Sequence, residues 1–155
     1  MAQPVRRRSW RSALEWLVPV VAVVVAVIVA AVGWVRLPDQ VATGWPQSGG
    51  VGGPSPRWLE LSIGVVVVAI AAAFTWPASL VASVRAARWL VVFAHVTAVA
   101  WLGRLIRVVS ANLDVAHWTD ADPRLSLPAI VVASVVAGAV GWAVSAHRQH
   151  GNPAR

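Results

Sequence analysis

The sequence predicts an all-α integral membrane protein, a four-helix bundle with both termini in the cytoplasm. Three observations lead to this fold class. Of the 155 residues, 58% are hydrophobic and only 12% are charged, whereas soluble domains carry roughly 25% charged residues. The apolar residues gather in four long stretches, and the arginines lie mainly at the ends of those stretches. This is the positive-inside pattern of membrane proteins, so the partner expected from the net charge of +7 is a lipid bilayer and not a nucleic acid.

The first predicted span covers residues 14–35 and follows a basic segment, residues 1–12. A helix needs about 20 residues to cross the hydrocarbon layer, and this run is long enough. A cleaved signal peptide would have an apolar core of only about 7–15 residues and a small-residue cleavage site. The run is longer than that and ends in GWVRLP, so we expect an uncleaved helix that Pro19 can kink.

Three further apolar stretches complete a membrane domain over residues 13–146, and a basic tail, residues 147–155, follows it. Their valine-rich sequence is typical of strands, but strands are usually under about ten residues long. A membrane barrel would also alternate polar and apolar positions, which these stretches do not. Helices are therefore expected, with a bend at Pro77 in the second span. The three spans are residues 59–81, 89–109 and 127–146.

The arginine distribution predicts the orientation of the chain. With the N-terminus inside, the inner segments hold eight arginines, the outer loops hold three, and the other two lie within the third span. The positive-inside rule then places both termini in the cytoplasm, with the protein in the plasma membrane of a bacterial cell. Two outer loops, residues 36–58 and 110–126, are expected to face out of the cell.

Small residues are spaced so that the helices can approach one another closely, which is what drives helix association in lipid. We expect these faces to pack within the bundle, with a homodimer or a membrane-protein partner as the alternative. The small residues are Ala133, Ala137, Gly141 and Ser145, flanked by Ser134 and Gly138, in the fourth span, Ala22, Ala26 and Ala30 in the first, and Ala94 and Ala98 in the third.

Ionisable residues in the spans are candidates for function, because a charge at the bilayer centre costs at least about 2.5 kcal/mol. Spans two and three are antiparallel, so Glu60 is expected to form an ion pair with Arg104 or Arg107. His95 lies near mid-depth in the third span. A histidine there can relay protons or respond to pH, but more often it donates a hydrogen bond to a helix carbonyl.

The second outer loop contributes Asp114 and Trp118 as candidate site residues. Asp114 is positioned to cap or neutralise the end of the third span. The acidic residues of this loop do not have the spacing of a calcium-binding loop, and no serine stands in a nucleophile-elbow context. We therefore expect no metal, no cofactor and no catalytic activity.

The first outer loop holds four prolines and five glycines between Arg36 and Trp58, so neither a helix nor other regular structure is expected in it. Pro38 restricts the chain as it leaves the membrane. Asp39 is expected to accept hydrogen bonds from nearby backbone amides in an Asx-type turn, and Trp45 to dock at the headgroup layer.

The segment LPDQVATGW in this loop resembles the signature of the family catalogued as domain of unknown function 1648. That signature has Leu-Pro-Asp at the outer end of a first membrane helix, then an apolar position, usually a His and an aromatic residue, and then a Gly. The stretch ANLDVAHWTDADPR, residues 111–124, is similar to the region before the last helix of short members. Gly44 stands where the family usually has His, which weakens any role that needs an imidazole there. The matching residues are Leu37, Pro38, Asp39, Val41, Trp45 and Gly49 or Gly50.

Three functions remain open at this point. The first is a non-catalytic binding or accessory protein of the envelope that acts at its outer face. The second follows from the resemblance alone, because the family is similar in part to SdpI-type immunity proteins, which protect a producing cell from its own secreted toxin. The third is a small transporter or sensor that uses His95 with the cluster of Glu60, Arg104 and Arg107.

Overall fold

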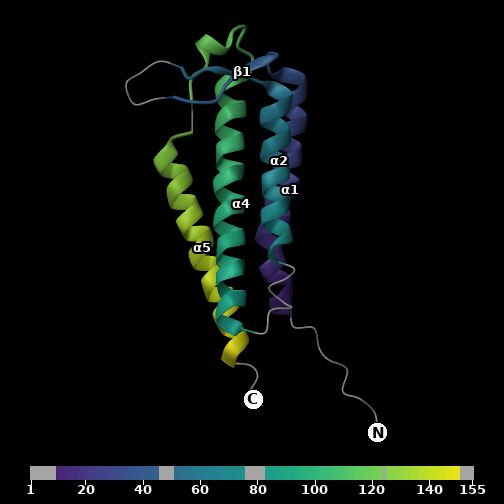
Figure 1. Ribbon diagram of the computed structural model, residues 1–155, viewed down its shortest axis with the longest axis vertical. Coiled ribbons are helices and arrows are strands. Elements are labelled where there is room, and N and C mark those ends of the chain that lie inside the picture. Colours follow the sequence, from purple (N-terminus) through teal and green to yellow (C-terminus); the bar gives the residue numbers. More distant parts are fainter. Residues whose placement is uncertain (1–9, 46–50, 76–82, 124, 151–155) are drawn as a thin grey trace.

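Four long helices run alongside one another in the computed structural model, which describes residues 10–45, 51–75, 83–123 and 125–150 (Figure 1). The prediction of a helical protein is confirmed. At one end of the bundle the connecting segments form a cap. The first turn of the first helix and the last turn of the fourth helix both lie at the other end. The helices are α1 (Trp10–Arg36), α2 (Arg57–Ala73), α4 (Val84–Asn112) and α5 (Leu127–His150).

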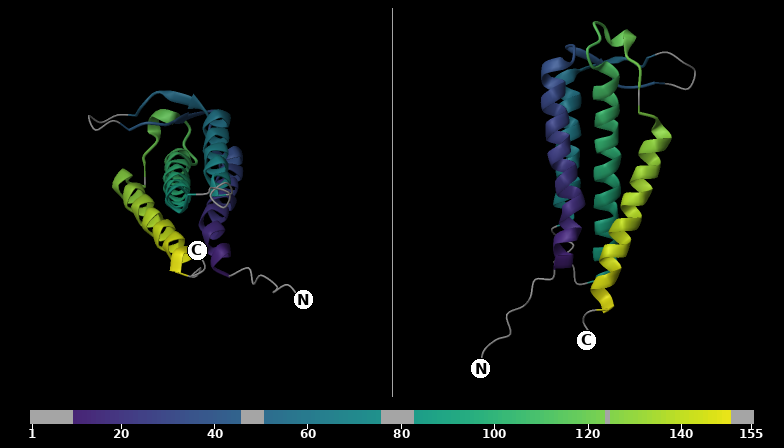
Figure 2. Two further views of the ribbon diagram at one scale, coloured as in Figure 1. Left: turned by 60° about the horizontal axis from the view of Figure 1, so that its bottom comes forward. Right: turned by 180° about the vertical axis from the view of Figure 1, so that it is seen from behind.

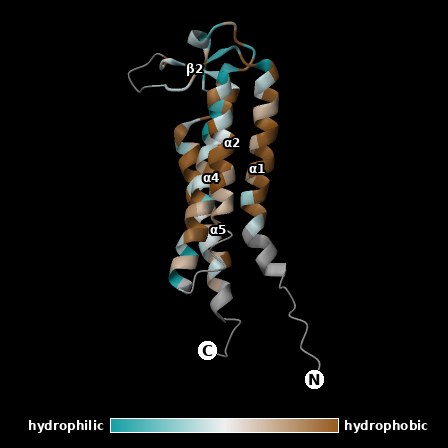
Figure 3. Ribbon diagram, turned by 45° about the vertical axis from the view of Figure 1, so that its right-hand side comes forward, coloured by the Kyte–Doolittle hydropathy of each residue, from teal (hydrophilic) through white to brown (hydrophobic). Residues whose placement is uncertain are grey.

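Three of these helices are long and apolar enough to cross a membrane, over Trp16–Arg36, Arg85–Asn112 and Leu127–Ala146. The chain therefore has the helices of a membrane protein, and the segments of the capped end are more hydrophilic than the middle of α1 (Figure 3). Helix α2 has 17 residues, about 26 Å at 1.5 Å per residue, and is shorter than the roughly 30 Å hydrocarbon layer. The inner part of the second predicted span, with Pro77, lies outside the described residues.

The helices extend beyond the predicted spans. Helix α4 begins at Val84, inside the predicted connector, and ends at Asn112. Alanine and arginine are good helix formers, and the Ser83 hydroxyl accepts a hydrogen bond from the Ala86 amide at 3.4 Å as an N-cap. Helix α1 continues through the buried Pro19 without interruption. Helix α5 extends to His150, into the predicted tail.

Helix α4 is the centre of the bundle. It packs against α1, α2 and α5, whereas α5 packs mainly on α4 and lies apart from α2 (Figure 2). Ala26, Ala94 and Ala98 are completely buried, as the small-residue pattern predicts for packing inside the bundle. Close approach of the helices is thus achieved with alanine rather than with large side chains.

The face that α5 turns toward α4 differs in one position from the predicted stripe. Ala137, Gly141 and Ser145 are buried, but Ala133 is exposed, so its inclusion in the packed face was wrong. Ser134 and Ile130 lie on the buried side instead. A Cβ atom added to Gly138 would lie 2.8 Å from a methyl group of Val96. The rotation of α5 about its own axis is therefore set by Gly138, which permits close contact with α4.

The first outer loop contains regular structure, contrary to the sequence prediction. Strands β1 (Gln40–Ala42) and β2 (Pro54–Pro56) form a two-stranded antiparallel sheet in which Val41 is opposite Ser55. The two prolines of β2 are opposite Gln40 and Ala42. Proline is tolerated in a short edge strand wherever its missing N–H is not needed by the partner strand. A 3₁₀ turn, η1 (Trp118–Asp120), lies beside this sheet.

Candidate functional site

The site is the end of the bundle formed by β1, β2, η1 and the adjoining ends of α1, α2 and α4, which we call the capped end. Its central contact joins Asn112, the last residue of α4, to Ala42 in β1. The Ala42 amide donates to Asn112 Oδ1 at 2.7 Å, and Asn112 Nδ2 donates to the carbonyls of Ala42 at 2.9 Å and Val108 at 2.8 Å. Both main-chain polar groups of Ala42 thus point away from β2. Position 54, which is opposite Ala42, therefore needs no N–H to donate, and proline is tolerated at that position. Sequence analysis missed Asn112.

Two ion pairs fasten the capped end to the helices. Asp114 pairs with Arg36 at the end of α1, and Arg36 Nε donates to Asp114 Oδ1 at 3.1 Å. Asp114 therefore links two helices instead of capping its own, and it adopts a positive φ of 61°. Arg57 lies 3.2 Å from Asp39 and donates to the Leu37 carbonyl at 2.6 Å. The carboxylate of Asp39 is engaged by this arginine, and among the described residues no backbone amide donates to it as an Asx turn would require.

Trp45 connects the two outer loops. Its Nε1 donates to the Ala121 carbonyl at 3.3 Å, and the guanidinium of Arg107 lies 5.1 Å from its ring centroid. Trp118 packs against the same small apolar cluster, which includes Ala42 and Ala121. Trp45 is half-buried between Ala121 and Arg107, and its docking at the headgroup layer stays a prediction.

The motif residues of the first loop form the apolar underside of the capped end. Leu37 and Val41 are buried in the main core, and Pro38 is half-buried. Gly49 lies outside the described residues. The amide of Gly52 donates to the Gly44 carbonyl at 2.6 Å, and a Cβ on Gly52 would meet that oxygen at 2.9 Å. This close approach of two backbone segments requires glycine at position 52.

The predicted ion pair between α2 and α4 is present. Arg104 Nη2 lies 2.7 Å from Glu60 Oε2, although the contact lacks the alignment of a hydrogen bond. Glu60 is buried, and Arg104 also lies over the Trp101 ring at 5.2 Å. Arg107, one turn further along α4, is not part of this pair. Its Nε is buried, and no acceptor lies within hydrogen-bond reach among the described residues.

His95 is separated from this cluster. Arg104 follows His95 by nine positions of α4, which is about 14 Å along the helix. His95 is completely buried; its Nδ1 is 2.8 Å from the Val91 carbonyl oxygen, and its Nε2 has no partner in the described part of the chain. Helix α5 packs against the imidazole at Gly141, where an added Cβ would lie 3.2 Å from the ring. The structure therefore places His95 in the helix packing and does not bring it together with Glu60.

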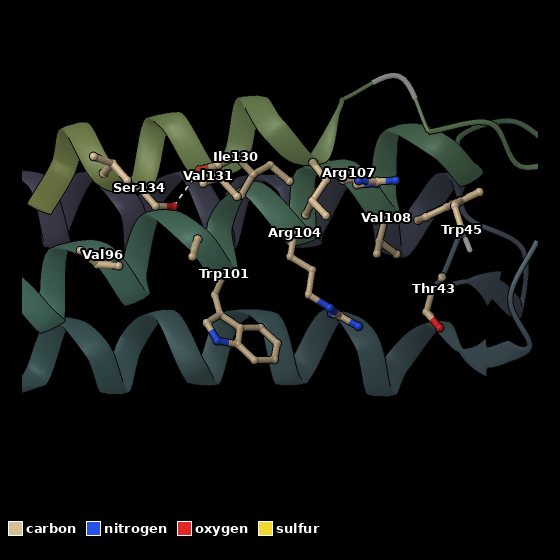
Figure 4. A pocket seen from close by; sticks show the side chains of 14 residues that line it. Thr43, Trp45, Val96, Trp101, Arg104, Arg107, Val108, Ile130, Val131 and Ser134 are labelled. Atoms are coloured by element: carbon tan, nitrogen blue, oxygen red, sulfur yellow. Dashed lines mark hydrogen bonds between the residues drawn. The ribbon is translucent and has the colours of Figure 1, made fainter. Parts of the chain in front are cut away.

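A cavity of about 640 Å³ lies between α4, α5 and the segment after β1 (Figure 4). Its walls are mainly apolar, and Arg104 and Arg107 lie toward the capped end. The cavity exists because the first turn of α5 stands away from α4 (Figure 1). Hydrophobic pattern alone gives no sign of such a gap, so sequence analysis missed it.

Comparisons with known proteins assign no family. No protein-family model matches the chain, and no curated protein or solved structure has significant similarity to it. The resemblance to the family of domain of unknown function 1648 stays a prediction based on two motifs. Within the described residues, no group of three His, Asp or Glu side chains is placed to hold a metal ion.

Proposed function

We propose that this chain is a multi-pass protein of a bacterial plasma membrane that binds another envelope protein at its capped end and acts as an accessory subunit. The contact between Asn112 and Ala42 carries the proposal, because it joins residues 70 positions apart and fixes β1 on the end of α4. The bond from Trp45 to Ala121 fastens the second loop to the first. A surface that is already ordered loses less entropy when a partner binds.

Transport or sensing is supported less well. Such an activity would need a chain of titratable groups through the bundle. Five acidic residues lie at the capped end or in its adjoining helix turns: Asp39, Glu60, Asp114, Asp120 and Asp122. Glu15 lies near the start of α1, at the other end of the bundle, and His95 lies about 14 Å from Arg104 along α4. Binding is the activity that an ordered surface at the capped end favours.

The resemblance supports a second candidate function. Leu37 and Val41, two residues of the family-like motif, are the buried side chains that seat β1 on the helices. If the chain is an immunity protein, the same capped end would bind a secreted, membrane-active toxin. Cells that lack the protein would then be killed by that toxin, and restoring the chain would protect them.

A photo-crosslinking residue tests the proposal in intact membranes. It would replace His117, which is exposed beside η1, and as a matched control Val136, which is exposed on the lipid-facing side of α5. We expect one stoichiometric protein adduct from position 117, none from position 136, and loss of the adduct when Asn112→Ala is added. Adducts with lipid alone from position 117 would contradict a protein partner.

A further inference from the structure

The cavity beside α4 is an elongated groove that can be reached from the side of the bundle. It follows α4 from Val96 to Val108, about three helical turns. On the α5 side, Leu127, Val131 and Val135 line it, and each of these residues is more than half exposed. In a membrane-spanning bundle, these side chains face the acyl chains of the bilayer. The groove therefore opens toward lipid.

The end of the groove near the cap carries an uncompensated positive charge. Arg104 is neutralised by Glu60 at 2.7 Å. Arg107 has no carboxylate partner among the described residues; its guanidinium stacks on Trp45, and its buried Nε lacks an acceptor. A buried donor of this kind favours a ligand that brings anionic oxygens. Thr43 lines the same end and supplies a hydroxyl.

The two ends of the groove thus require different chemistry in one ligand. The stretch beside Val96, Ala100 and Ile130 is apolar, so a small free anion would find partners only at the other end of the groove, at Arg107 and Thr43. An uncharged hydrocarbon would leave the Arg107 Nε unsatisfied. Arg107 also lies near the end of a membrane-spanning helix, at the depth where headgroups and their charges are found.

We propose that this groove binds one anionic phospholipid of the surrounding bilayer. Its phosphate accepts hydrogen bonds from Arg107, and one acyl chain lies along α4 toward Val96, between α4 and α5. This inference goes beyond the proposed partner at the capped end, because it concerns the side of the bundle. The lipid would fill the gap beside the first turn of α5 and connect that helix to the rest of the bundle.

The test uses the purified full chain in a non-ionic detergent. Phosphatidylglycerol and phosphatidylcholine with the same acyl chains are titrated separately, and bound lipid is counted by native mass spectrometry. We expect one phosphatidylglycerol to be retained per chain and phosphatidylcholine to bind more weakly. Arg107→Gln should weaken phosphatidylglycerol binding about tenfold, since a hydrogen bond to a charged group is lost. Arg85→Gln, the same charge change at the exposed start of α4, should have no effect.

Two further measurements separate the groove from a simple anion site. Ala100→Leu fills the apolar part without changing charge and should also weaken phosphatidylglycerol binding. Excess inorganic phosphate should not displace the lipid. Equal binding of the two lipids, displacement by phosphate, or unchanged binding in Arg107→Gln would overturn the proposal. If circular dichroism shows that Arg107→Gln is unfolded, the Ala100→Leu result decides, and unchanged binding there would overturn it as well.

Discussion

The side-chain amide of Asn112 binds both main-chain polar groups of Ala42, with an acceptor distance of 2.7 Å and a donor distance of 2.9 Å. This side chain takes the place of a third strand, on the edge of β1 that faces away from β2. Both residues are completely buried, so water cannot replace these bonds. The asparagine at the end of α4 therefore holds strand β1 on the bundle.

Replacing that asparagine should destabilise the protein. Asn112→Ala leaves a buried amide and a buried carbonyl of Ala42 without partners, which costs about 1–3 kcal/mol for each unsatisfied group. We expect a lower midpoint of thermal unfolding in detergent. Ser110→Ala is the matched control, because the Ser110 hydroxyl bonds only to the Arg107 carbonyl of its own helix. Equal effects of the two substitutions would show that the contact with β1 contributes little.

The ion pair between Glu60 and Arg104 should respond unequally to the removal of its partners. Glu60 is buried, whereas the Arg104 side chain is 36% exposed and can also stack on Trp101. Arg104→Gln leaves a buried carboxylate unpaired and should destabilise more than Glu60→Gln, which leaves an arginine that can reach the interface. A double-mutant cycle should give a coupling of about 0.5–3 kcal/mol. Additive effects would mean that the two charges do not interact.

Gly138 of α5 should not tolerate a larger residue. Gly138→Ala places a methyl group 2.8 Å from Val96, and such overpacking costs about 1–3 kcal/mol. Val96→Ala, added to Gly138→Ala, should restore part of the thermal stability by removing the opposing methyl groups. Gly53→Ala is the control, since nothing lies within 4 Å of the added atom. If Gly138→Ala is as stable as the parent protein, α5 does not pack against Val96 as closely as the structure shows.

Loss of the imidazole of His95 should leave binding at the capped end intact. His95 lies about 14 Å along α4 from Arg104, and within the described residues its side chain forms one hydrogen bond, with the Val91 carbonyl of its own helix. We expect His95→Leu to retain the protein adduct formed from position 117. A folded His95→Leu variant without that adduct would instead support a sensor in which His95 communicates with the capped end.

The sequence was sufficient for features that depend on local composition or on neighbouring helices. Helical stretches follow from apolar length, and the contact of Glu60 with Arg104 follows from the antiparallel order of α2 and α4. The burial of Ala26 and Ala98 follows from the need for small residues between helices in lipid.

Features that depend on distant partners were missed. The sheet of β1 and β2 contradicts the local preference of a Gly- and Pro-rich loop, and it depends on Asn112, 70 positions from Ala42. A polar residue at the end of a long apolar helix, inside the second family-like stretch, was the available signal. The pairing of Arg36 with Asp114 joins residues 78 positions apart. The groove depends on how α5 is placed against α4, which no residue pattern encodes.

We propose that the capped end faces out of the cell, where it is free to bind a partner. The chain contains no cysteine, so single cysteines can be labelled without background. His117→Cys places one beside η1, and Ala86→Cys places one in the exposed first turn of α4, at the opposite end of the bundle. A membrane-impermeant maleimide should label position 117 in intact cells and position 86 only after lysis. The reverse pattern would contradict the account.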